Sequence, residues 1–126
     1  MKVLSVTKDV EGAGGFVRLP ISEIAYMAFD KKINRVVVHT PEDEYYLMGT
    51  VQYWLNAILA DGSTFIWVDR TNVVNIDRIR YMDPILHTAY FVDEPTKSSK
   101  RCTLTDIRFD EIESRLEWSY AKRRYI

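Results

Sequence analysis

The sequence predicts a mainly β fold with one buried helix at about residues 50–60 and a C-terminal helix at about residues 108–122. Short β-branched and aromatic runs, separated by turn-forming residues, fill most of the chain and are typical of antiparallel strands. Between them, five apolar residues recur at i, i+3, i+4, i+7 and i+8, which is one face of a helix: Val51, Trp54, Leu55, Ile58 and Leu59. Near the C-terminus helical spacing returns, so the two helices are expected within a β framework.

The strands of the first half are recognised by their apolar content and by the turns between them. They are predicted at residues 1–6, 16–19, 24–29, 35–39 and 45–47. Pro20 ends the second of these strands. The Gly-rich segment at residues 11–15 is either a flexible joint or a hairpin loop, because glycine accepts positive φ.

The first helix has a clear start and stop. The hydroxyl of Thr50 can accept a hydrogen bond from a free N–H group of the first turn. Asp61, Gly62 and Ser63 then end the helix. We expect the apolar stripe of this helix to pack on the sheets as part of the core.

Residues 64–82 are the stretch around which the chain is organised. A strand at residues 65–68 leads to a polar crest, Asp69-Arg70-Thr71, and an apolar pair follows at residues 73–74. A turn at residues 75–77 precedes a further strand. Polar groups mounted between two buried segments are held on a rigid base, which is how binding residues are usually presented.

The last third combines a hairpin and a helix. Strands are predicted at residues 86–92 and 101–105, with two lysines in the loop between them. From Arg108 onward, Phe109, Ile112 and Leu116 share one helical face. A basic tail at residues 117–126 continues this helix.

Composition indicates a single soluble domain. The 126 residues are 47% hydrophobic and 28% charged, no apolar run could span a bilayer, and no signal-peptide core is present. The single cysteine cannot form an internal disulfide, so we expect a reducing cytoplasm. The net charge of −1 argues against strong non-specific binding to phosphate. Residues 96–126 nevertheless hold 8 Lys/Arg against 5 Asp/Glu, a local basic excess.

Catalytic patterns are missing from the sequence. His39 and His87 lie in separate predicted strands, and neither has a Cys, Asp or Glu at a metal-ligand spacing. Cys102 is either a small buried hydrophobic residue or a thiol that neighbouring Arg101 activates. The sequence therefore predicts a protein that is not an enzyme and needs no metal or cofactor.

The central stretch resembles the LytTR DNA-binding domain. In that family an aromatic-rich strand leads through a polar triplet to an apolar pair and an asparagine, and here these are Asp69-Arg70-Thr71 and Val73-Val74-Asn75. The resemblance covers residues 16–116, between an N-terminal strand with its Gly-rich joint at 1–15 and the basic tail at 117–126. It implies an elongated arrangement of small antiparallel sheets.

The resemblance also implies that loops, not a recognition helix, read DNA in the major groove. The family's three reading loops correspond here to residues 31–35, 69–71 and 101–108. Lysines there suit phosphates, Arg70 suits guanine O6 and N7, and Asn34 either reads a base edge or closes a turn. The candidate DNA-binding residues are Lys31, Lys32, Asn34, Arg35, Arg70, Thr71, Lys97, Lys100, Arg101, Thr105 and Arg108.

Two aspartates depart from the family pattern. Asp69 stands where the family often has histidine, and Thr105-Asp106 stands where it often has Ser-Arg. A carboxylate repels phosphate unless it accepts from a cytosine amine or pairs with a cation such as Arg70. Asp106 could instead cap the helix that follows.

Two functions follow from these observations. The first is a free-standing transcriptional regulator that binds promoter repeats in double-stranded DNA, as a homodimer, without a small-molecule substrate. The initiating methionine and short N-terminus favour a free-standing chain over a fragment, and similar stand-alone members suggest a regulatory protein partner that could be membrane-bound. The alternative is a LytTR-like protein-interaction module that has weakened or lost DNA binding.

Overall fold

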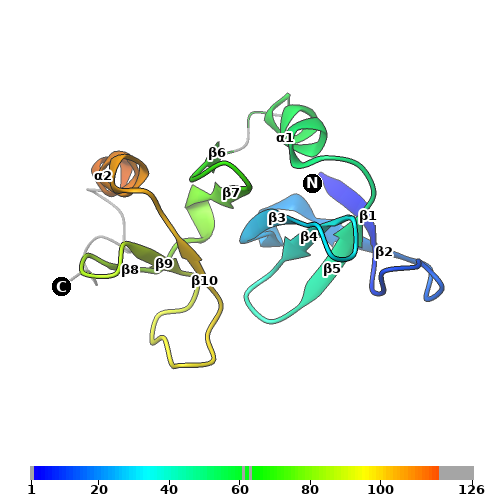
Figure 1. Cartoon of the computed structure of the whole chain (residues 1–126), viewed down its shortest axis with the longest axis horizontal. Coiled ribbons are helices and arrows are strands. Elements are labelled where there is room, and N and C mark those ends of the chain that lie inside the picture. The colour runs from blue at the N-terminus through cyan, green and yellow to red at the C-terminus, as the bar shows by residue number, and fades with distance from the viewer. Residues whose placement is uncertain (1, 61, 63, 117–126) are drawn as a thin grey trace.

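The computed structural model describes residues 2–60, 62 and 64–116. In this part of the chain, ten strands form two antiparallel sheets and two α-helices pack on them (Figure 1). The three-stranded sheet lies beside the seven-stranded one along the longest axis of the molecule (Figure 1). The predicted mainly β fold with two helices is confirmed. None of the helices in the described residues is long and apolar enough to cross a membrane.

The larger sheet has the strand order β2-β1-β5-β4-β3-β7-β6. Its strands are β1 Val3–Thr7, β2 Phe16–Pro20, β3 Tyr26–Asp30, β4 Arg35–His39, β5 Glu44–Leu47, β6 Phe65–Trp67 and β7 Asn72–Asn75. Strands β1 and β2 pair along their whole length, so the Gly-rich segment is a hairpin loop. A short 3-10 helix, η1 (Ile21–Glu23), connects β2 to β3.

Helix α1 (Val51–Leu59) packs its apolar stripe on this sheet. Its N-cap is Thr50, whose hydroxyl accepts from the amide of Tyr53 at 3.0 Å. The stripe is narrower than predicted: Ile58 is 1% exposed, whereas Leu59 is 43% exposed and Trp54 is only partly buried. At 100° per residue, Leu59 and Trp54 lie about 80° and 60° to either side of Val51, which explains why both flank the buried face.

The smaller sheet has the order β10-β9-β8 and carries the second helix. Its strands are β8 Tyr81–Asp83, β9 Thr88–Tyr90 and β10 Arg101–Thr103. Helix α2 (Asp106–Arg115) begins two residues before the predicted start, because Thr105 is its N-cap and accepts from the amide of Arg108 at 3.3 Å. The predicted end at residue 122 lies outside the described residues. Asp106 is thus the first helical residue and does not cap the helix.

The two sheets share a core. Val74 of β7 belongs to the same buried cluster as Met82 of β8 and Ile112 of α2. Buried Asn75 fixes this junction: its side chain donates to the carbonyl of Ile24 at 3.0 Å and accepts from the hydroxyl of Thr64 at 2.9 Å. The 3-10 helix η2 (Ile76–Arg78) then turns the chain toward the smaller sheet, so the elements on either side of it pack as one body.

Candidate nucleic-acid interface

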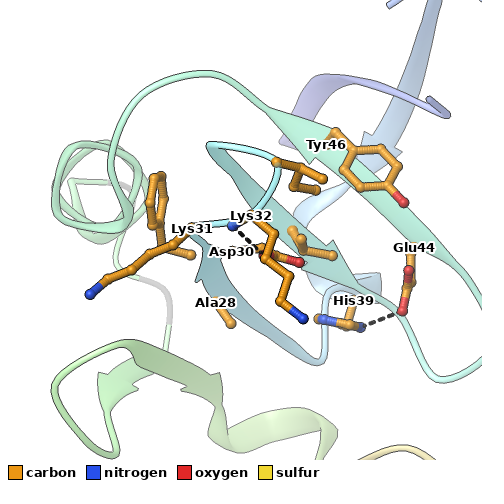
Figure 2. Close-up of a pocket in the computed structure, with 10 residues that line it drawn as sticks. Ala28, Asp30, Lys31, Lys32, His39, Glu44 and Tyr46 are labelled. Atoms are coloured by element: carbon orange, nitrogen blue, oxygen red, sulfur yellow. Dashed lines mark hydrogen bonds and ion pairs between the residues drawn. The ribbon is translucent and has the colours of Figure 1, made fainter. Parts of the chain in front are cut away.

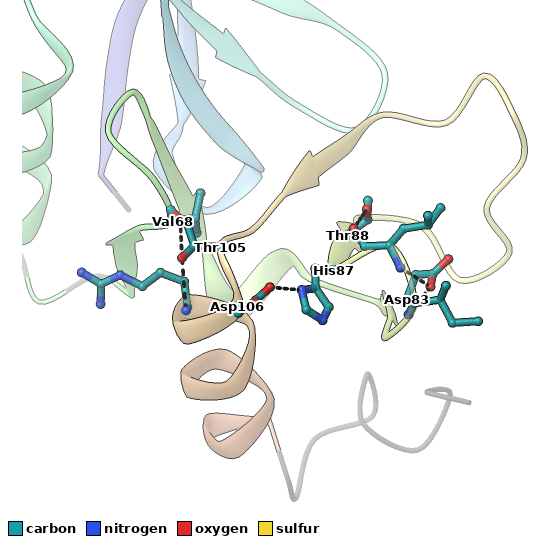
Figure 3. A network of polar contacts seen from close by, with 9 residues as sticks. Val68, Asp83, His87, Thr88, Thr105 and Asp106 are labelled. Carbon is teal, nitrogen blue, oxygen red and sulfur yellow. Dashed lines mark hydrogen bonds and ion pairs between the residues drawn. The ribbon is translucent and has the colours of Figure 1, made fainter.

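Three loops meet at one edge of the molecule, which we call the three-loop edge: residues 31–34, 68–71 and 104–108. The first follows β3 and the second precedes β7, and these strands pair through Ala28 and Asn72, so their loops are neighbours. The third begins where the amide and hydroxyl of Thr105 approach the carbonyl of Val68, at 3.5 and 3.4 Å (Figure 3). Pairing between distant segments therefore brings together parts of all three predicted reading loops.

The β3–β4 turn presents two lysines and fixes an arginine. Lys31 and Lys32 are exposed, and Asp30 accepts from the amide of Lys32 at 2.9 Å. Asn34 has φ 56°, a left-handed conformation that asparagine tolerates, so it closes the turn while its residue stays exposed. The guanidinium of Arg35 donates to the carbonyls of Asn34 at 2.9 Å and Val10 at 3.0 Å, tying this turn to the β1–β2 loop.

Beside this turn, the sheet surface is hollowed over β3, β4 and β5, with a volume of about 450 Å³. His39, Glu44 and Tyr46 line the hollow (Figure 2). Lys32 reaches over it toward His39, whereas Lys31 extends away (Figure 2). The two lysine side chains of this turn therefore extend in different directions.

The β6–β7 loop is closed by its own aspartate. One carboxylate oxygen of Asp69 accepts from the amides of Thr71 and Asn72, both at 2.8 Å, and from the hydroxyl of Thr71 at 3.2 Å. The side-chain amide of Asn72 donates to the second oxygen at 2.8 Å. Burial raises the pKa of Asp69, but these hydrogen bonds outweigh it and lower the pKa below the ordinary 3.8. The carboxylate is thus directed into the loop.

Arg70 stands at the tip of this loop and is exposed. Its side chain has no hydrogen bond or ion pair among the residues that the structure describes, so the alternative pairing with Asp69 does not form. Because Asp69 is occupied by its own loop, Arg70 is available to an external acceptor.

At the start of α2, both charged side chains have partners. A carboxylate oxygen of Asp106 lies 2.6 Å from Nδ1 of His87, in the β8–β9 turn (Figure 3). Arg108 donates to Glu111, one turn along the helix, at 2.6 Å. Sequence reasoning missed the role of His87 because the contact joins two segments nineteen positions apart, and no local motif predicts it.

The hairpin cations lie away from the three-loop edge. Strand β10 runs from Arg101 toward Thr105, so the β9–β10 loop is at its far end. There, Nζ of Lys100 donates to the carbonyl of Asp43 and lies 3.3 Å from Nδ1 of His39. His39 pairs with Tyr26, at the opposite end of β3 from the lysine turn.

The other two hairpin cations differ in how they are held. Arg101 donates to the carbonyl of Lys97 at 2.7 Å and stacks over the ring of Tyr90 at 5.1 Å. Lys97 is exposed. Of the eleven predicted residues, the structure therefore groups Lys31, Lys32, Asn34, Arg70, Thr71, Thr105 and Arg108, and Arg35 lies behind the lysine turn.

The pKa values of partly buried His39 and of buried Cys102 are strongly shifted. Burial, reinforced by the charge of Lys100, lowers the pKa of His39 to about 4, and its ring stacks on Tyr26 at 4.2 Å. Burial raises the pKa of the Cys102 thiol to about 12, which fits the buried hydrophobic residue among the two alternatives. In the described residues, no three His, Cys, Asp or Glu side chains are grouped as metal ligands.

Comparisons with known proteins agree with this architecture. A family model described as the LytTr DNA-binding domain matches residues 14–117. A solved LytTr DNA-binding domain from Bacillus cereus superposes with a TM-score of 0.64 at 18% identity, covering 94% of this chain and 99% of that one. At that identity the likeness concerns the fold alone. Among curated proteins, none matches the sequence.

Proposed function

Because the chain belongs to the LytTr DNA-binding domain family, we propose that it binds double-stranded DNA sequence-specifically, with loop side chains in the major groove, as a transcriptional regulator. One observation carries the proposal. Exposed Lys31 and Lys32 of the β3–β4 turn and exposed Arg70 of the β6–β7 loop lie on one edge, where both neighbouring aspartates already have intramolecular partners. The edge therefore offers cations to phosphate while each of these carboxylates is held by an intramolecular contact.

The side chains of the edge divide into base readers and phosphate contacts. Arg70, at the tip of a loop closed from within, is suited to bidentate donation to guanine O6 and N7. Lys31 and Lys32 are suited to phosphates on either side, with Thr71 and Thr105 as neutral donors. Asn34 offers an amide to a base edge in addition to closing its turn.

The β9–β10 hairpin would contribute less. Lys97 is exposed and could meet a neighbouring phosphate. Lys100 and Arg101 would first have to leave Asp43 and the loop carbonyls that they bind. Arg108 would likewise have to leave Glu111.

The proposal extends to the assembly. A homodimer on repeated half-sites, acting as a free-standing regulator under the control of a partner protein, is the arrangement expected from similar family members. The mass of the complex with one-site and two-site duplexes tests it: two copies on the two-site duplex support a dimer. One copy on either duplex contradicts it.

Selection of bound duplexes from random DNA, followed by salt-titrated binding to the selected sequence, tests the function. We expect Arg70→Ala to remove about 1–3 kcal/mol of discrimination at one base pair while leaving the salt slope nearly unchanged. Arg18→Ala, on exposed edge strand β2, is the matched control and should change neither quantity.

A uniform loss across all sequences would make Arg70 a phosphate contact instead. If the unmodified protein binds duplexes without sequence preference, the regulator proposal fails. The interaction-module alternative, motivated by the acidic balance of residues 1–95 with 9 Lys/Arg against 13 Asp/Glu, would then be favoured.

A further inference from the structure

In the pair formed by His87 and Asp106, the position of the His87 ring is fixed by contacts with the rest of the protein. His87 ends the β8–β9 turn with φ 50°, and its carbonyl accepts from the amide of Leu104 at 2.8 Å. Its ring stacks on Phe109 of α2 at 4.8 Å, with 25° between the planes. The imidazole is therefore fixed by backbone and stacking, and its Nδ1 lies 2.6 Å from Asp106 (Figure 3).

Asp106 lies at the three-loop edge. It directly follows Thr105, whose amide and hydroxyl approach the carbonyl of Val68, and Val68 begins the loop that carries Arg70. The side chain of Asp106 is 85% exposed, against 34% for His87. A free carboxylate in this position would repel the phosphates of DNA that approaches Arg70.

Other charged groups near the pair are already engaged. The carboxylate of Asp83, in the same turn as His87, accepts from the amides of Ile85 and Leu86 at 2.8 and 3.1 Å. Arg108 is paired with Glu111 on α2, and Asp69 binds within its own loop. Among the residues that the structure describes, His87 is the one ion-pair partner of Asp106.

We propose that His87 is a positioning residue for DNA binding, whose imidazole holds the Asp106 carboxylate at the reading edge. The inference rests on the proposed function and deepens it. Because Nδ1 of His87 lies 2.6 Å from this carboxylate, removal of the imidazole releases an 85% exposed carboxylate beside the DNA. Loss of the His87 side chain should therefore weaken DNA binding through Asp106.

The experiment is a double-mutant cycle on the full chain with the selected duplex as probe: unmodified protein, His87→Asn, Asp106→Asn and the double variant. Asparagine tolerates positive φ, so the turn at residue 87 is retained, and thermal melting confirms that each variant is folded. We expect His87→Asn to weaken binding about two- to fivefold, the range for one exposed charged contact. The same substitution should change little when residue 106 is already asparagine.

Equal losses from His87→Asn in both backgrounds would show that His87 contacts DNA itself or only supports the fold, and would overturn the inference. A loss of affinity from Asp106→Asn alone would show that Asp106 itself reads a base, and this outcome would also overturn the inference.

The results distinguish failure of this inference from failure of the proposed function. If the unmodified chain binds no DNA, the proposed function falls and this inference falls with it. Sequence-specific binding without coupling in the cycle removes the inference alone.

Discussion

Asp69 is the first residue of the polar crest, and its carboxylate points into the loop rather than toward solvent. The sequence left several interactions open for this side chain: it could repel phosphate, accept a hydrogen bond from a cytosine amine or pair with Arg70. The choice depends on how the backbone of residues 69–72 closes, and four donors of Thr71 and Asn72 decide it. Residue types alone therefore predicted a polar loop here but not the direction of its aspartate.

At this scale we predict that Asp69→Ala destabilises the protein by about 1–3 kcal/mol, since it leaves loop donors unsatisfied. Asp69→Asn keeps an acceptor oxygen and should lose less. Denaturant unfolding at pH 7 measures both. Because the pKa of Asp69 is lowered in the folded state, its contribution is present above the ordinary 3.8 and is lost as the pH falls below it. Equal stability of all three proteins would contradict the loop closure described here.

Helix α1 shows what periodicity can and cannot predict for a whole element. The predicted helix at 50–60 agrees with Val51–Leu59, because cap, stripe and stop signals all fall within one short segment. The width of the buried face was overestimated, since spacing alone does not reveal how closely the sheet approaches each flank. Trp54 accordingly sits at the rim, where its indole N–H donates to the carbonyl of Met48 at 2.7 Å.

Adjacent substitutions in α1 test this difference. Ile58→Ala, at a fully buried position, should cost about 2–5 kcal/mol of unfolding free energy. Leu59→Ala should cost less than about 1 kcal/mol, because half-exposed leucine loses little on truncation. Chemical denaturation of the two variants gives the ranking, and a larger loss from Leu59→Ala would mean that the helix is rotated.

The sequence also did not predict the contact between the β9–β10 hairpin and the larger sheet. The lysines of this hairpin suggested phosphate contacts, yet Lys100 binds at the β4–β5 end of the larger sheet. We predict that Lys100→Met raises the pKa of His39 from about 4 toward the ordinary 6.5, because one of the two causes of the shift is removed. NMR titration of the His39 ring measures the change, with Lys97→Met as the control. An unaltered His39 pKa would show that Lys100 does not lie beside it in solution.

For the whole molecule, the sequence predicted most elements, whereas the three-loop edge depends on their assembly. That edge requires Ala28 to pair with Asn72 and Thr105 to meet Val68, contacts over 44 and 37 positions. Nothing local in the sequence specifies such partners. The family resemblance named three segments, and the fold shows that Thr105 of the third lies beside the second, whereas Arg101 lies at the far end of β10.

The buried histidine makes stability of the whole molecule depend on pH. With the folded-state pKa of His39 near 4 and an ordinary value of 6.5, the unfolded chain binds the extra proton between these values. Stability is therefore present above pH 6.5 and falls as the pH drops toward 4, by about 3 kcal/mol at 1.36 kcal/mol per pKa unit. Denaturant unfolding at pH 7 and 4.5 should show most of this loss. His39→Phe should reduce it, and an undiminished loss in that variant would assign it elsewhere.

The closure of residues 69–72 by their own side chains has a consequence for how new specificities could arise. Among the residues that the structure describes, the side chain of Asp69 hydrogen-bonds to Thr71 and Asn72, so Arg70 at the tip can change without altering what holds the loop together. Under the proposed function, proteins with this loop can differ in the DNA sequences that they prefer by exchanging this one position while the rest of the loop stays the same.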